Sequence, residues 1–345
     1  MDNPFRILGA TPHDDRRRIM ELAEEAALSR DPDECAEARS VLTNPRKRLA
    51  AEMSWLPGVD PGRAAALASW FDKTSGINGR RFTGSYALYL DSNMTPIAQA
   101  NVFAAEIRHA CYASPEELSR SIRDLAVAFD EIDAEDIAYV INDDRAEAEF
   151  PEVPDLSAVE SEIRERRRYY LDTIKSALDT LPTEELVAAL TSIVKSATND
   201  GTDICPYVIS DLVDLYEAKA QTFFDREMKY AIKIAEQIQN KAKWKQSNND
   251  IIPHINELFR VVRNWKYVAR PIELHAKAAG RDYTMDSQIF RLVRSIGVDM
   301  CNRYRNAFLS RMLLGSLHEL FPDAEGLAKD LETLDEIINK TASIY

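Results

Sequence analysis

The chain has 345 residues, of which 45% are hydrophobic and 29% are charged, and its formal net charge at pH 7 is −14. This length and composition predict a soluble globular protein of two or three domains. No segment approaches the ~18 uninterrupted apolar residues of a membrane span, and charged residues interrupt the N-terminal region where a signal peptide needs an apolar run. The four cysteines have no paired spacing, which favours reduced thiols and a cytoplasmic location.

The charge is unevenly distributed along the chain. Residues 1–222 carry −17, residues 223–311 hold 17 Lys and Arg against 9 Asp and Glu (+8), and residues 312–345 carry −5. A basic block inside an acidic chain can bind nucleic acid or an acidic partner, or it can face the carboxylates of its own chain. The surplus of acid in the same chain favours the internal pairing, so nucleic-acid binding is the weaker alternative.

The first fifty-odd residues predict a group of short helices. Gly9 is expected to close the first helix, because glycine readily adopts the left-handed conformation that ends helices. Thr11 as N-cap, followed by Pro12, predicts a second helix that runs to about Leu28. Its apolar and small residues are spaced three or four positions apart, which places them on one face of the helix. They are Ile19, Leu22, Ala23, Ala26 and Ala27.

Two more helices are expected before residue 57. Asp31 as N-cap and Pro32 at the first helical position predict the start of a third helix. Pro45 predicts the start of a fourth. The apolar residues of this fourth helix are expected to pack back on the preceding hairpin, and they are Leu49, Met53, Trp55 and Leu56.

Two sequence segments in this region, residues 3–9 and 41–49, resemble the opening and closing helices of a J-domain, the module that docks on heat-shock chaperone ATPases. The resemblance covers residues 3–56, about one sixth of the chain. It implies that the protein is a co-chaperone whose docking residues are three arginines of the second helix and the tripeptide after it, where J-domains carry His-Pro-Asp. These residues are Arg16, Arg17, Arg18, Asp31, Pro32 and Asp33.

The chain departs from the J-domain pattern at functionally important positions. Asp31 replaces the histidine. The second helix, which is basic in J-domains, is acidic here because it carries Glu21, Glu24 and Glu25. Like charges on a docking face weaken association with an acidic ATPase. The Asp31-Pro32-Asp33 sequence is also an ordinary capped helix start that requires no partner.

The complete pattern predicts an all-α fold, a small J-like helical hairpin domain followed by a multi-helix bundle or array. We expect the J-like module at residues 1–57, an irregular linker at 58–94, a helical subdomain at 95–150 and a helical body at 151–345. The glycine-rich part of the linker is compatible with a loop and a short helix or with a lone strand. The body includes a coiled-coil-like helix at residues 206–245, which could pair with itself in a homo-oligomer or with another chain.

A group of aromatic and basic residues marks the later part of the body. The residue types in this group are found in binding hot spots, but an aromatic corner that locks two helices together explains the group as well. Its members are Trp265, Tyr267, Arg270 and Pro271. Proline at 271 predicts that the helix containing Trp265 ends at Arg270. A further short helix is expected from Ile272 to Ala279, ending at Gly280.

The sequence contains no recognisable catalytic or metal-binding motif. The five histidines lie outside helical reach of one another and of any cysteine, and no nucleophile motif or phosphate loop is present. We therefore expect no metal, no cofactor and no enzymatic activity. Two hypotheses remain, a co-chaperone adaptor for a heat-shock ATPase and a helical scaffold subunit whose J-like module only packs.

Overall fold

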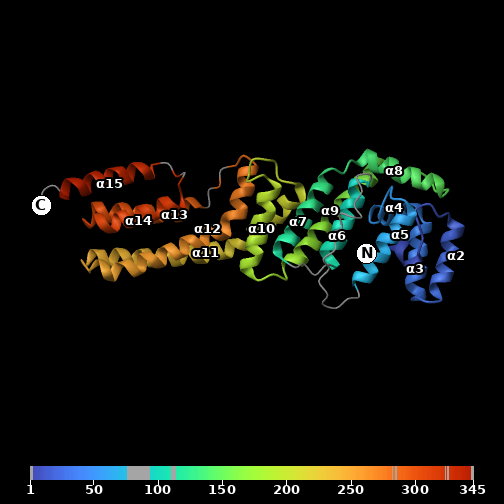
Figure 1. The fold of residues 1–345 in the computed structure, drawn as a ribbon, viewed down its shortest axis with the longest axis horizontal. Helices are drawn as coiled ribbons and strands as arrows, with labels where there is room; N and C mark the ends of the chain where they lie inside the picture. The colour runs from blue at the N-terminus through green and yellow to red at the C-terminus, as the bar shows by residue number, and fades with distance from the viewer. Residues whose placement is uncertain are drawn as a thin grey trace. The chain divides into compact units, whose positions relative to one another are not determined.

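The computed structural model describes residues 3–75, 94–109, 114–281, 283, 286–322, 324 and 326–342. Within these ranges it contains fifteen α-helices and no strand, which confirms the all-α prediction (Figure 1). The chain divides into two compact units, residues 1–212 and 213–345. No helix in the described ranges is long and apolar enough to cross a membrane.

The first unit contains ten complete helices and the start of an eleventh. Their bounds are α1 Pro4–Leu8, α2 Arg16–Ala27, α3 Pro32–Thr43, α4 Pro45–Met53, α5 Pro61–Ser75, α6 Pro96–His109, α7 Pro115–Asp130, α8 Ala134–Glu147, α9 Leu156–Leu178 and α10 Thr183–Ala197. α2 and α1 both pack on α3, and α6 packs on α7 and α9. α5 lies within the segment 58–94 that we expected to be an irregular linker, while the glycine-rich stretch at 76–93 lies outside the described residues.

Local sequence signals explain most of these helix ends. Gly9 has φ = 66° and closes α1, as expected. The predicted cap of the second helix is wrong, because Asp15 caps α2 by accepting a bond from the Arg18 N–H. Asp14 instead accepts bonds from the Thr11 backbone N–H and hydroxyl, so these residues form a turn that precedes the helix.

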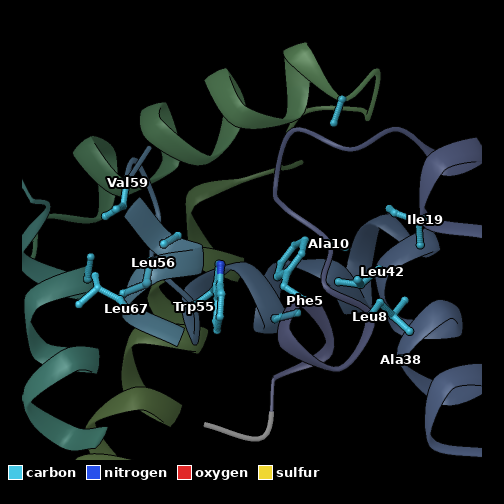
Figure 2. Packing of buried hydrophobic residues seen from close by; sticks show 14 of the residues in the cluster. Phe5, Leu8, Ala10, Ile19, Ala38, Leu42, Trp55, Leu56, Val59 and Leu67 are labelled. Carbon is cyan, nitrogen blue, oxygen red and sulfur yellow. The ribbon is translucent and has the colours of Figure 1, made fainter. Parts of the chain in front are cut away.

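The core of the N-terminal helices extends well beyond residue 57. Phe5 and Trp55 lie side by side, with ring centroids 6.5 Å apart, in a cluster that also includes Val102 and Phe150 (Figure 2). Leu49 and Met53 do not pack on the hairpin as predicted, since they join a second cluster with residues of α6, α8 and α9, namely Ile97, Ile137, Ile141 and Val159. α4 therefore packs on the preceding helices on one side and on the following ones on the other.

The second unit contains most of one long helix and four further helices. α11 is Tyr207–Lys243, α12 is Asn248–Ala278, α13 is Asp286–Asn302, α14 is Ala307–Leu320 and α15 is Leu327–Ala342. The long helix predicted at 206–245 is thus present, and its 37 residues span roughly 55 Å. α14 packs on α12, α13 and α15.

α11 and α12 form an antiparallel pair within the unit. The Tyr216 hydroxyl donates to the Val268 carbonyl, and the rings of Phe224 and Trp265 are 4.6 Å apart. Further along, the Tyr230 hydroxyl contacts the Glu257 carboxylate. The residue numbers rise on one helix as they fall on the other, so the partner of the long helix in this structure is α12 of the same chain.

The predicted helix end at Arg270 is wrong, since α12 continues through Pro271 to Ala278. Proline removes one intrahelical N–H and normally kinks or breaks a helix. Here residues on both sides of Pro271 are buried, including Ala269, Ile272 and Leu274. Tertiary packing therefore outweighs the local preference for ending the helix, because each buried aliphatic side chain contributes about 1.5–3 kcal/mol.

Candidate functional site

The three arginines of α2 lie at the start of the helix and interact within the chain. Arg17 Nε is 3.1 Å from Glu21 Oε1, and Arg18 Nη1 is 3.3 Å from Glu21 Oε2 and 3.4 Å from Glu25 Oε1. Hydrogen bonds from the two guanidiniums lower the pKa of the Glu21 carboxyl. The Arg16 guanidinium lies over the Phe150 ring, 5.4 Å from its centroid. The positive charge of this surface is thus largely offset by its own acidic neighbours.

The Asp31-Pro32-Asp33 tripeptide begins α3. Asp31 Oδ1 accepts a bond of 2.8 Å from the Asp33 N–H, and Pro32 occupies the first turn of the helix. The capped helix start predicted for these residues is therefore present in the structure. All three residues are exposed. The tripeptide follows the far end of α2 from the arginines, and a twelve-residue helix is about 18 Å long, so the structure does not bring the two sets together into one compact site.

Residues of the body group separate into core and surface. Trp265 is buried, and its indole N–H donates to Asp286 at 2.9 Å. Pro271 is buried too. Tyr267 is 45% exposed, and Arg270 Nη1 is 3.2 Å from Glu273 Oε2. Trp265 thus joins α12 to α11 through Phe224 and to the start of α13 through Asp286, as in the aromatic-corner alternative.

The most elaborate polar arrangement is a buried ion cluster that the sequence analysis missed. Arg48, Glu52 and Arg145 are at most 3% exposed. Glu52 lies between the two arginines, with Oε1 2.7 Å from Arg48 Nε and Oε2 2.8 Å from Arg145 Nη2. Phe150 covers the Arg48 guanidinium, with the ring centroid 4.0 Å away. Burial lowers the pKa of Arg48, and Glu52 acts in the opposite direction.

The cluster also binds backbone carbonyls from four places in the chain. Arg48 donates to Pro12 O at 2.5 Å and to Leu42 O at 3.4 Å. Arg145 donates to Pro45 O at 3.0 Å and Pro151 O at 3.2 Å. These bonds connect the α1–α2 loop, both ends of the α3–α4 junction and the segment after α8. The i, i+4 spacing of Arg48 and Glu52 was visible in the sequence, but nothing marked Arg145 as their partner.

A second buried polar group joins the end of α4 to α6 and α9. The Asn101 amide donates to Met53 O at 3.0 Å and Trp55 O at 2.7 Å. Its carbonyl oxygen accepts from Arg166 Nη2 and from the Tyr170 hydroxyl, both at 2.7 Å. Burial raises the pKa of Tyr170, so its hydroxyl stays a donor.

His13 connects the α1–α2 loop to α8. Its Nε2 is 2.9 Å from Asp144 Oδ1, and its Nδ1 is 2.9 Å from Glu147 Oε2. Burial raises the pKa of the Asp144 carboxyl, although the bond from His13 opposes this effect. No group of three or more His, Cys, Asp or Glu in the described ranges has a geometry suited to a metal ion.

A cavity of about 700 Å³ in the first unit lies among α6, α7, α9 and α10. Charged side chains of both signs line it, including Arg108, Asp172 and Glu185, together with hydroxyls such as those of Thr173 and Ser176. This mixed lining selects no single ligand charge.

Comparison of the chain with protein-family models, curated proteins and solved structures finds no match.

Proposed function

We propose that the protein is a helical interaction scaffold in which the J-like N-terminal segment serves as a packing module. The buried cluster of Arg48, Glu52 and Arg145 is the observation that carries this proposal. It connects α4 to α8 and to the loops around them, and such a cluster positions helices rather than contacting a partner. Three ionic side chains below 4% exposure are shielded from any docking protein.

The surface residues of the J-like segment support the same proposal. A chaperone-docking face needs a positive surface that steers an acidic partner towards it. Here Arg17 and Arg18 have Glu21 and Glu25 as immediate neighbours, and the Asp31 carboxylate caps α3. The side chains that would contact a chaperone are therefore already bonded to groups of the same chain.

A co-chaperone adaptor is the second candidate. It is favoured by the exposure of Arg17, whose side chain is 87% exposed, and by the exposed Asp31-Pro32-Asp33 turn. Exposed ion pairs are weak, so a sufficiently acidic partner could compete with Glu21 for Arg17.

Steady-state ATP hydrolysis by a heat-shock chaperone ATPase distinguishes the two candidates. The scaffold proposal predicts that the natural protein leaves the rate unchanged. Stimulation by the natural protein, lost in Arg17→Ala and retained in a matched Arg39→Ala control on α3, would establish the adaptor instead. An Asp31→His variant tests whether the missing histidine alone explains an inactive module.

The scaffold proposal also concerns self-association. The partner of α11 within this chain is α12, so pairing between two copies would use the remaining faces of α11. Its exposed apolar residues include Leu215 and Ile232. A molar mass measured by light scattering that falls in an Ile232→Lys variant would show a homo-oligomer through α11, and a monomeric mass for the natural protein would direct the search to other partners.

A further inference from the structure

Several cations of the basic block at residues 223–311 have carboxylates beside them within the second unit. Lys266 Nζ is 2.8 Å from Asp286 Oδ2, and Arg294 Nε is 2.7 Å from Asp330 Oδ2. Similar pairs involve Arg226, Arg260, Arg270 and Arg311. The block is therefore not a uniform positive surface.

Other cations of the block gather at two neighbouring turns, the α11–α12 turn at residues 244–247 and the α13–α14 turn at residues 303–306. Both turns are at the same end of the second unit (Figure 1). Asn306 Nδ2 donates to Asn248 Oδ1 at 2.7 Å, and Gln239 Nε2 lies 3.4 Å from Asp299 Oδ2. These bonds hold the two turns beside each other.

Four exposed cations come from these turns and from the last residue of α11, and within the described ranges none of them forms an ion pair. They are Lys243, Lys245, Arg303 and Arg305. The nearby carboxylates have other contacts, since Asp250 accepts from the Ser247 hydroxyl at 2.6 Å and Asp299 faces Gln239. We call this set the tip cations.

Two large aromatic side chains stand among the tip cations. Trp244 is 75% exposed and lies between Lys243 and Lys245, and Phe308 is 60% exposed just after Arg305. Exposure of a tryptophan to this extent leaves most of its apolar surface in water, which is unfavourable unless a partner covers it.

In each of the two turns, one basic residue has a backbone conformation that is unusual for a residue other than glycine. Lys245 has φ = 54° and Arg305 has φ = 58°, in the left-handed region that favours glycine or asparagine. Both follow a helix end closed in a similar way, with the Gln246 N–H bonded to Lys241 O and the Asn306 N–H to Met300 O. A long basic side chain at such a position costs some stability relative to glycine, which suggests that its charge has a use.

Cations near helix C-termini also interact favourably with the helix dipole. That effect explains a positive charge at each turn but not an exposed tryptophan between two lysines. Phosphate groups paired with cations and bases stacked on aromatic rings explain both features together.

We propose that this tip, formed by the tip cations with Trp244 and Phe308, binds single-stranded nucleic acid. The cations would contact phosphates, and the two aromatic rings would provide stacking platforms for bases. An acidic polypeptide would satisfy the cations but would make no use of flat aromatic surfaces, so nucleic acid fits the side chains better.

The test is fluorescence anisotropy of a labelled oligothymidylate with the full-length protein over a range of salt concentrations. Four phosphate contacts predict a slope of log affinity against log salt of about −2.8, because each contact on a single strand contributes about −0.7. The Lys243→Ala/Lys245→Ala variant should halve this slope, while the control Lys229→Ala, about 21 Å away along α11, should leave it unchanged.

Stacking is tested separately with Trp244→Ala. Loss of one stacked base should weaken binding about 5- to 150-fold without changing the salt slope. Quenching of tryptophan fluorescence by the oligonucleotide should be reduced in the same variant, because Trp244 is exposed whereas Trp55 and Trp265 are buried.

Three results would overturn the proposal. The first is no binding at low salt, and the second is equal binding by the tip variants and the Lys229→Ala control. The third is binding of polyglutamate as tight as that of the oligonucleotide and unaffected by Trp244→Ala, which would identify an acidic polypeptide as the partner.

Discussion

Replacing Glu52 with glutamine tests whether the buried ion cluster holds the first unit together. The substitution keeps the size of the side chain and removes its charge. Arg48 and Arg145 would then remain at most 1% exposed, with four backbone carbonyls as acceptors and without the carboxylate that both guanidiniums bind. Breaking a buried pair by removing one partner costs about 3–5 kcal/mol. Because Glu52 serves two arginines, we expect a loss in the upper part of that range.

The measurement is urea unfolding followed by far-ultraviolet circular dichroism, with hydrogen exchange read by mass spectrometry to locate the effect. Exchange should accelerate in peptides from α3, α4 and α8, the helices that the cluster connects. The matched control is Glu21→Gln, which removes an i, i+4 carboxylate from exposed Arg17 on α2. We expect no measurable change in that variant, because exposed ion pairs contribute little.

A double variant separates the effect of charge from the loss of contacts. In Glu52→Gln/Arg145→Met, one of the two uncompensated charges is removed along with its hydrogen bonds. If the buried charge dominates, the double variant is more stable than the sum of the two single losses predicts. A loss below about 1 kcal/mol for Glu52→Gln, or strict additivity in the double variant, would refute the role that we give to the cluster.

Three further predictions follow from the first unit. Gly58 has φ = 70°, and a Cβ there would lie 2.9 Å from a Val140 methyl, so Gly58→Ala should lower the free energy of unfolding by about 1–3 kcal/mol in a urea titration. Burial raises the pKa of Glu106 to about 7, above its ordinary 4.5, so stability should fall as the pH rises from about 4.5 to 7. Glu106→Gln should abolish that fall and be up to about 3 kcal/mol more stable at pH 8, whereas an unchanged pH profile would contradict the assignment. A fragment of residues 1–58 should give a weak helical signal because it lacks Arg145 and Phe150, while residues 1–212 should fold.

Helix positions were predictable from local sequence where caps and prolines mark them. Asp31-Pro32 and the long apolar period at 206–245 gave the correct elements, since these signals act within one or two turns of the chain. Pro271 was misleading for a physical reason. The helix-breaking effect of proline is a local cost, and burial of the residues around it is a tertiary gain that no local pattern reports.

The candidate sites were less predictable than the helices. Arg145 is 93 residues from Glu52, and Asp144 is 131 residues from His13, so no spacing rule could link them. The aromatic group at 265–271 was visible, but its division into a buried Trp265 and an exposed Tyr267 depends on which face of α12 meets α11. Composition identified the basic block, whereas the position of four of its cations at one end of the second unit depends on the contact of Asn306 with Asn248.

The two units differ in whether the cations discussed above are paired with carboxylates, and this difference affects what each unit can bind. In the first unit, Glu52 pairs with the buried Arg48 and Arg145, and the more exposed Glu21 pairs with Arg17 and Arg18. A partner that docks there must displace those carboxylates, and its gain is reduced by the interactions it breaks. At the tip, Lys243 and Arg305 have no such competitor within the described ranges, so an anion gains their full attraction. If the protein has a polyanionic partner, the tip of the second unit is where its charge would be recognised.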